Sequence, residues 1–128
     1  MDAFTVASRG DAGIVHYMKS KFWAGALCYA YRATSDYDTR YIAYYMDYTY
    51  DIIKKSFLTQ TSIPAINKSD LDTYLIMIPK PDQKNSSLEK QIKTANILSK
   101  YDELIAIAKN QFNTLQTLKK GLLQQMFK

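Results

Sequence analysis

An unbroken helical pattern in the last third of the chain constrains the fold more than any other feature of the sequence. No proline follows Pro81, and from Leu88 onward apolar residues return every three or four positions. The alternation is regular between Tyr101 and Leu115, which is the spacing of a coiled-coil seam. The sequence therefore predicts one long helix over residues 88–128. Its apolar stripe is Leu88, Ile92, Ala95, Leu98, Tyr101, Ile105, Ala108, Phe112, Leu115, Leu118, Leu122 and Met126.

The start of this helix is marked by prolines and by a capping pattern. Pro79 and Pro81 stop regular structure, so we expect a polar linker over residues 80–87. Ser86 precedes Glu89 by three positions, as in a capping box. Gly121 is expected to weaken the last turns.

The expected length of the helix has a consequence for its partners. From Ser87 to about Phe127 it would extend roughly 60 Å at 1.5 Å per residue. A domain of about 80 residues measures only about 25–30 Å across. We therefore expect most of the helix to project and its stripe to pack against a helix from outside the chain. A helical hairpin is the alternative, but no turn signal lies between Ser87 and Gly121.

Residues 1–79 have the pattern of a small domain with strands and helices. Apolar runs predict strands over residues 4–8, 13–17 and 26–32, with a turn at residues 9–13 between the first two. A helix is predicted from about Tyr37 to Ser56. Its predicted buried stripe is Tyr41, Tyr44, Tyr45, Tyr48, Ile52 and Ile53. An extended piece at 63–66, a helical turn at 67–73 and a strand at 74–78 follow. The predicted fold class is α+β, a small mixed α/β domain followed by one long C-terminal coiled-coil helix.

The charge of the chain is unevenly distributed. The formal net charge is +5. Residues 1–79 carry eight Lys or Arg and eight Asp or Glu, whereas residues 80–128 carry nine Lys and four Asp or Glu. The excess therefore lies entirely in the C-terminal segment, which favours an anionic partner such as nucleic acid. A solvated, lysine-rich helix face is the alternative.

Residues able to perform catalysis are scarce. His16 is the only histidine and Cys28 the only cysteine, so a His/Cys metal cluster within one chain is excluded. A Cys–His pair lacks a third group, and we expect ordinary packing for both residues. The acidic pairs Asp36/Asp38 and Asp70/Asp72 stand near expected helix starts and are interpreted as caps.

No phosphate-binding loop, dinucleotide fingerprint or methyltransferase motif is present in the sequence. We therefore expect a non-enzyme without metal or cofactor. No apolar run resembles a membrane span or a signal peptide. The lone cysteine points to a reducing compartment. A cytoplasmic protein is the resulting expectation.

Two features fit contact with nucleic acid. Arg9 stands beside Gly10 in a turn, where it is able to bind a guanine edge or a phosphate. Tyr17 is an aromatic residue close to Lys19 and Lys21.

The motifs together resemble one known family. Residues 74–81 resemble the strand ending in Ile-Pro-x-Pro that closes a target recognition domain of type I restriction-modification specificity subunits. The following helix resembles that of the same family at Leu88, Gln91, Ala95, Leu98, Ser99 and residues 102–105, and residues 115–127 resemble its ending. Upstream, residues 8–15 and 61–66 resemble the second half of the recognition domain. The chain departs from the family at Lys90, where glutamate is usual, and at Thr94, where an aliphatic residue is usual.

The resemblance implies a non-catalytic role in a larger enzyme complex. A family subunit carries two recognition domains, each reading half of a split site in double-stranded DNA. Two paired helices hold the readers apart and dock methyltransferase subunits, and restriction subunits complete the complex. Carried onto this chain, DNA contact is expected from Arg9, Gly10, Tyr17, Lys19, Lys21, Thr61 and Ser62. Helix pairing is expected from Tyr101, Ile105, Ala108, Phe112, Leu115 and Leu122.

The expected organisation is that of half a subunit. Recognition domains of the family usually begin well before the Ser-Arg-Gly turn, so residues 1–79 are interpreted as a partial domain, followed by the linker and the helix. Such a chain is expected to pair through its helix with a second copy or with another specificity half. The alternative is an interaction module or cassette remnant that pairs with an intact specificity or methyltransferase subunit and does not bind DNA.

Overall fold

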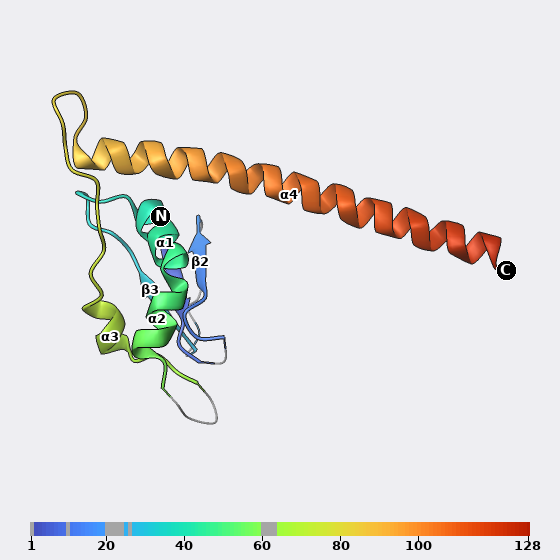
Figure 1. Ribbon diagram of the computed structural model, residues 1–128, viewed down its shortest axis with the longest axis horizontal. Helices are drawn as coiled ribbons and strands as arrows, with labels where there is room; N and C mark the ends of the chain where they lie inside the picture. The colour runs from blue at the N-terminus through green and yellow to red at the C-terminus, as the bar shows by residue number, and fades with distance from the viewer. Residues whose placement is uncertain (1, 10, 20–24, 26, 60–63) are drawn as a thin grey trace. The chain divides into compact units, whose positions relative to one another are not determined.

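The computed structural model describes residues 2–9, 11–19, 25, 27–59 and 64–128 of the chain (Figure 1). The chain divides into two compact units, Met1–Ala95 and Asn96–Lys128. Within the described residues the architecture is α+β, as predicted, and combines one antiparallel sheet with helices. The elements are β1 (Ala3–Ala7), β2 (Val15–Met18), β3 (Cys28–Tyr31), α1 (Thr39–Tyr48), α2 (Tyr50–Phe57), α3 (Lys68–Asp72) and α4 (Ser87–Met126).

The sheet has the order β2-β1-β3, with β1 in the centre. Phe4 of β1 lies opposite Tyr17 of β2 and Tyr31 of β3, and the rings of Phe4 and Tyr31 stack with centroids 5.6 Å apart. Because residues two apart share one face of a strand, Val6 lies on the same side as Phe4. This face carries the hydrophobic core, which is completed by Ala12, Ala43, Met46, Ile53, Ile66 and Leu71.

The predicted helix over residues 37–56 is divided into α1 and α2 at Thr49. Asp38 caps α1, since its side chain accepts the N–H of Tyr41 at 2.8 Å, which confirms the capping expected for Asp38.

The predicted buried stripe of this helix was wrong at Tyr48 and Ile52, which are 86% and 57% exposed. The buried apolar positions are Ala43, Met46 and Ile53. Ala43, Met46 and Ile53 have no polar side-chain group to satisfy, whereas a tyrosine tolerates an exposed position through its hydroxyl. The stripe was correct at Ile53, which is buried, and in part at Tyr41, Tyr44 and Tyr45, which are half-buried.

Two tyrosines of β3 attach the chain around α3 to the sheet. The hydroxyl of Tyr29 donates to the carbonyl of Ile66 at 3.0 Å, and that of Tyr31 donates to Asp72 at 2.9 Å. Asp72 also pairs with Lys68 at 2.7 Å, so it is bound at the end of α3 and does not cap its start as predicted. The hydrogen bonds from Lys68 and Tyr31 lower the pKa of Asp72. Burial and the bond to Asp72 raise the pKa of Tyr31, so its hydroxyl remains a donor.

The predicted strand at residues 74–78 was wrong, because this segment forms no ladder with any described strand. Its burial nevertheless alternates: Tyr74 and Ile76 pack against the core, whereas Leu75 and Met77 are 86% and 75% exposed. The segment contacts helices at two points. Tyr74 meets the ring of Phe57 of α2 edge-on at 5.9 Å, and the hydroxyl of Tyr41 of α1 donates to the carbonyl of Met77 at 3.1 Å. A helix offers no ladder groups to a neighbouring strand, which explains why the edge of the segment that faces α1 forms no ladder.

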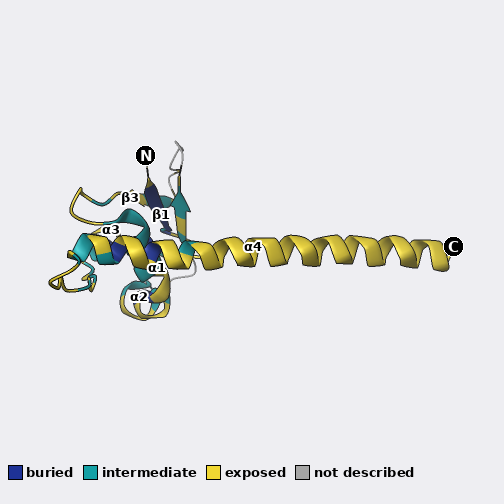
Figure 2. Ribbon diagram, turned by 90° about the horizontal axis from the view of Figure 1, so that it is seen from above, coloured by how far each residue is buried: buried dark blue, intermediate teal, exposed yellow. Residues whose placement is uncertain are grey.

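Helix α4 begins at Ser87, within one residue of the predicted start. The hydroxyl of Ser86 accepts the N–H of Glu89 at 3.1 Å, which confirms the predicted cap. The first turns of α4 belong to the first unit, where Gln91 and Ala95 are fully buried. The second unit, Asn96–Lys128, consists of the remainder of this helix, and its residues from Tyr101 onward are all exposed (Figure 2). No helix among the described residues is long and apolar enough to cross a membrane.

Candidate functional site

The Arg9 turn lies next to the segment that follows the predicted contact residues Thr61 and Ser62. Arg9 is exposed and forms an isolated antiparallel bridge with Ala65. The carbonyl of Ser8 accepts the N–H of Ile66 at 2.9 Å. Residues 8–9 and residues 65–66, which are far apart in the sequence, therefore meet at this end of the sheet. A contact surface shared by the two segments would require this proximity. Gly10, Lys21, Thr61 and Ser62 themselves lie outside the described residues.

Gly13 fixes the shape of this turn. It has a φ of +96°, a conformation that L side chains rarely adopt. Its N–H donates to the carbonyl of Ala7 at 2.8 Å, and a Cβ at this position would meet the ring of Tyr50 at 3.0 Å. The tight return of the chain after Arg9 thus requires glycine at position 13.

Tyr17 and Lys19 lie at the other end of the same hairpin. Met18, which precedes Lys19, is opposite Ala3 at the start of β1, whereas Arg9 follows the end of β1. At about 3.4 Å per residue, the six residues from Ala3 to Arg9 separate the two groups by roughly 20 Å. The structure therefore does not bring Arg9 together with Lys19.

Tyr17 and Lys19 differ in their availability to a ligand. Lys19 is exposed, whereas Tyr17 is half-buried and packs against the core. Burial and a hydrogen bond with Asp2 raise the pKa of Tyr17. Its hydroxyl is thus neutral and already engaged. DNA contact by Arg9, Tyr17 and Lys19 stays a prediction.

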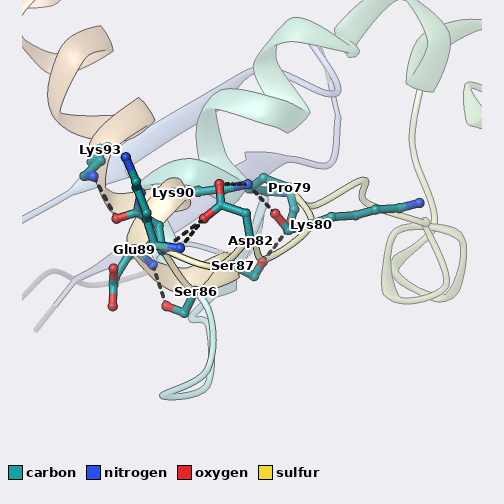
Figure 3. A network of polar contacts seen from close by, with 10 residues as sticks. Pro79, Lys80, Asp82, Ser86, Ser87, Glu89, Lys90 and Lys93 are labelled. Carbon is teal, nitrogen blue, oxygen red and sulfur yellow. Dashed lines mark hydrogen bonds and ion pairs between the residues drawn. The ribbon is translucent and has the colours of Figure 1, made fainter.

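The loop between residue 79 and α4 is held by polar contacts to the first turns of the helix (Figure 3). The Asp82 carboxylate accepts the N–H groups of Lys84 and Asn85 at 2.9 and 2.8 Å and pairs with Lys90 at 3.0 Å. Lys90 also donates to the carbonyl of Lys80 at 2.6 Å, and Lys93 donates to Asn85 at 2.8 Å (Figure 3). The backbone N–H of Asn85, then Lys90 and the N–H of Lys84, lower the pKa of Asp82 to about 2.

Gln91 connects the first turns of α4 to α1. Its side-chain oxygen accepts the N–H of Asp38 at 2.9 Å, and its side-chain nitrogen donates to the hydroxyl of Ser87 at 3.2 Å. Sequence reasoning missed this structural role, because Gln91 was absent from the predicted apolar stripe. The available signal was the spacing of Leu88, Gln91 and Ala95, which places the three residues on one helix face.

The apolar stripe of the second unit is exposed along its length. Tyr101, Ile105 and Phe112 are 62%, 51% and 59% exposed, and Leu115 and Leu122 are 63% and 50% exposed. Ala108 belongs to the same stripe and is also exposed. A helix in a protein gains its stability mainly from the packing of its apolar face. An exposed apolar stripe of this kind is therefore typical of a helix that pairs with another helix.

The opposite face of the same helix segment is polar and basic. No Asp or Glu follows Glu103, whereas Lys109, Lys119, Lys120 and Lys128 do. The positions from Lys109 to Gln124 that share one face are Lys109, Asn113, Gln116, Lys120 and Gln124. The second unit therefore carries five Lys against two Asp or Glu, whereas residues 80–95 of the first unit carry four Lys against two Asp or Glu.

Groups able to perform catalysis are not assembled in the part of the chain that the structure describes. No group of three or more His, Cys, Asp or Glu side chains there has the arrangement of a metal site. His16 lies on β2 and Cys28 on β3, with β1 between them, so the structure does not bring the pair together.

One family model matches both the domain and most of α4. The model of the type I restriction modification DNA specificity domain matches residues 1–117. The chain belongs to this family. As a type I specificity domain, it has the role of directing a restriction-modification system to DNA, and the match includes both the Arg9 turn and α4 as far as Thr117. No curated protein and no solved structure matches the chain.

Proposed function

We propose that this type I specificity domain reads one half of a split DNA site and positions methyltransferase and restriction subunits there without catalysing a reaction itself. The observation that carries the proposal is that one family match spans both the sheet domain and the exposed apolar stripe of α4. The domain supplies the contact with DNA, and the helix supplies the contact with protein.

The proposed DNA contact centres on Arg9 and on the loop residues beside it. Arg9 is exposed, and the bridge to Ala65 keeps the residue 64–66 segment adjacent. A guanidinium group binds a guanine edge or a phosphate through two hydrogen bonds. Gly10, Thr61 and Ser62 stay part of the proposed DNA contact. Lys19 and Tyr17 would contact the phosphate backbone from the other end of the hairpin, and Lys21 stays part of the proposed DNA contact.

The proposed protein contact is the stripe from Tyr101 to Leu122. A second copy of this chain, or another specificity half, would cover it in a coiled coil. Two copies related by a two-fold axis would read a symmetric, bipartite site. Methyltransferase subunits would dock on the paired helices, and the complex would act in the cytoplasm.

A second function is favoured by the distribution of charge. Residues 1–79 carry no net charge, and the excess of lysine lies in the segment that contains α4. Affinity for DNA depends strongly on the release of counterions by positive groups. The alternative is therefore an interaction module that pairs through α4 with an intact specificity or methyltransferase subunit and does not bind DNA.

Two measurements on the full chain separate these functions. The first is binding to a randomised double-stranded DNA library at low and at moderate salt, with sequencing of the retained duplexes. The second is co-purification with a methyltransferase subunit encoded in the same genome. Retention of duplexes that share a sequence supports DNA reading, whereas co-purification without any retained duplex supports the interaction module.

A further inference from the structure

The segment Tyr74–Ile78 has the properties of a β-strand that lacks its neighbour. Its side chains alternate between the core and solvent, and within the described residues its backbone forms no ladder. Leu75 and Met77 on the outer face are 86% and 75% exposed, and Ile78 is 40% exposed. Exposed apolar edges of this kind are usually covered in natural proteins.

One edge of the segment is occupied and the other is open. In a strand, the N–H and C=O of one residue point to the same edge, and residues two apart share that edge. The carbonyl of Met77 accepts the hydroxyl of Tyr41, so α1 lies on the edge shared by Leu75 and Met77. The other edge presents the N–H and C=O groups of Ile76 and Ile78 and the carbonyl of Tyr74, none of which has a hydrogen-bond partner in the described chain. In Figure 1 this segment, between α3 and the loop before α4, lies at the margin of the first unit with α1 and β3 to one side of it.

The open edge has defined limits. The N–H of Tyr74 already donates to the carbonyl of Leu71 at 3.2 Å, so the ladder cannot extend before Tyr74. Pro79 has no N–H, so it cannot extend beyond Ile78. A strand of five residues therefore satisfies this edge except at the carbonyl of Ile78, whose antiparallel donor would be the N–H of Tyr74 that Leu71 already binds.

We propose that a second copy of this chain pairs with this edge, antiparallel and centred on Ile76. The sequence Tyr-Leu-Ile-Met-Ile is uncharged and complementary to itself in this arrangement. Ile76 lies opposite its counterpart, and the two residues exchange both backbone hydrogen bonds. On the outer face Leu75 meets the partner's Met77, so each exposed side chain gains a large apolar neighbour.

The inner face supports the same register. Tyr74 meets the partner's Ile78, which covers a third exposed apolar residue. Tyr74 and Ile76 also line an open pocket of about 340 Å³ whose other walls include Phe4, Tyr31 and Met46. Neighbouring side chains on adjacent strands lie about 4.5–5.5 Å apart, so the partner's Ile76 would lie at the rim of this pocket. An isologous pairing of this kind closes after two copies.

Cross-linking between single cysteines tests the register directly. In a full chain with Cys28→Ser, Leu75→Cys and Met77→Cys are made as separate variants. Residue 75 faces the partner's residue 77 at a separation that suits a disulfide, whereas two copies of residue 75 are diagonal neighbours about 7–8 Å apart. On oxidation with oxidised glutathione, we expect a disulfide-linked dimer from the mixture of the two variants and little from either alone. Tyr48→Cys is the control for random collision, because Tyr48 is 86% exposed, like Leu75.

Every other outcome overturns the proposal. Equal cross-linking of the Tyr48→Cys variant would indicate collision, and cross-linking of each variant alone would indicate another register. A monomeric mixture without a disulfide would show that a second copy does not occupy this edge. The disulfide forms at residues 75 and 77, so its formation is independent of pairing through α4 and of DNA binding.

Discussion

The side-chain oxygen of Gln91 accepts the backbone N–H of Asp38 at 2.9 Å, and this bond joins the first turns of α4 to the capped start of α1. Gln91 is fully buried, and its nitrogen is bound to Ser87. A buried polar residue with both of its groups satisfied fixes the position of an element, whereas an apolar residue would allow it to slide. The hydrogen bond from Asp38 to Gln91 thus attaches the start of the family's helix to the domain at a defined position.

We predict that Gln91→Leu destabilises the chain by about 1–3 kcal/mol, because the N–H of Asp38 is left without its partner. Urea unfolding followed by circular dichroism measures this change. Gln116→Leu is the matched control, since Gln116 is exposed on the same helix. An equal effect of the two substitutions would show that the buried amide has no special role.

Two adjacent isoleucines of α2 should respond differently to truncation. Ile53 is fully buried and Ile52 is 57% exposed. Ile53→Ala is expected to cost about 2–5 kcal/mol of unfolding free energy, because it leaves a cavity in the core. Ile52→Ala should change the stability by less than about 1 kcal/mol. The reverse order in thermal or urea unfolding would contradict the burial of Ile53 and the exposure of Ile52.

The pKa of Asp82 should fall to about 2 in the folded chain. The pKa of an aspartate in an unfolded chain is about 3.9, so Asp82 binds a proton less readily in the folded state than in the unfolded state. The stabilisation from Asp82 is therefore complete above about pH 4 and is lost as the pH falls toward 2. Carboxyl titration by nuclear magnetic resonance measures the shift. Lys90→Ala should raise this pKa only partly, because the N–H groups of Asn85 and Lys84 remain, and full return to the ordinary value would contradict the assigned cause.

Substitution within the stripe of the second unit should abolish helix pairing. Ile105→Lys places a charge in the centre of the proposed seam, and we expect the dissociation constant of the paired form to rise by more than about tenfold. Analytical ultracentrifugation over a concentration series measures this. Asn113→Lys adds the same charge on the polar face and should leave pairing unchanged. If the wild-type chain shows no association, the stripe has another partner.

The long helix and its cap could be predicted from the sequence because both depend on local chemistry. A three-four apolar repeat without proline specifies a helix, and Ser86 binds an N–H group only three residues away. The three strands of the sheet were also predicted, with bounds that differ by one or two residues, because short apolar runs between turns specify them.

The remaining features depend on contacts between distant residues. Residues 74–78 have the sequence pattern of a strand, but a strand forms a ladder only where another strand lies beside it. The described neighbours of this segment include Tyr41 of α1 and Phe57 of α2, which belong to helices. The role of Gln91 depends on Asp38, which is 53 positions away in the sequence. The proximity of Arg9 to Ala65 likewise follows from tertiary pairing and has no local signature.

Sequence-selective binding to duplex DNA tests the account most directly. The full chain should retain from a randomised library duplexes that share a motif in two separated parts, with an affinity that falls as salt rises. Arg9→Ala should weaken binding to a selected duplex by about 1–3 kcal/mol, whereas Lys55→Ala, exposed on α2, should have little effect. Absence of binding at low salt, or equal binding to every duplex, would contradict the proposed reading of DNA.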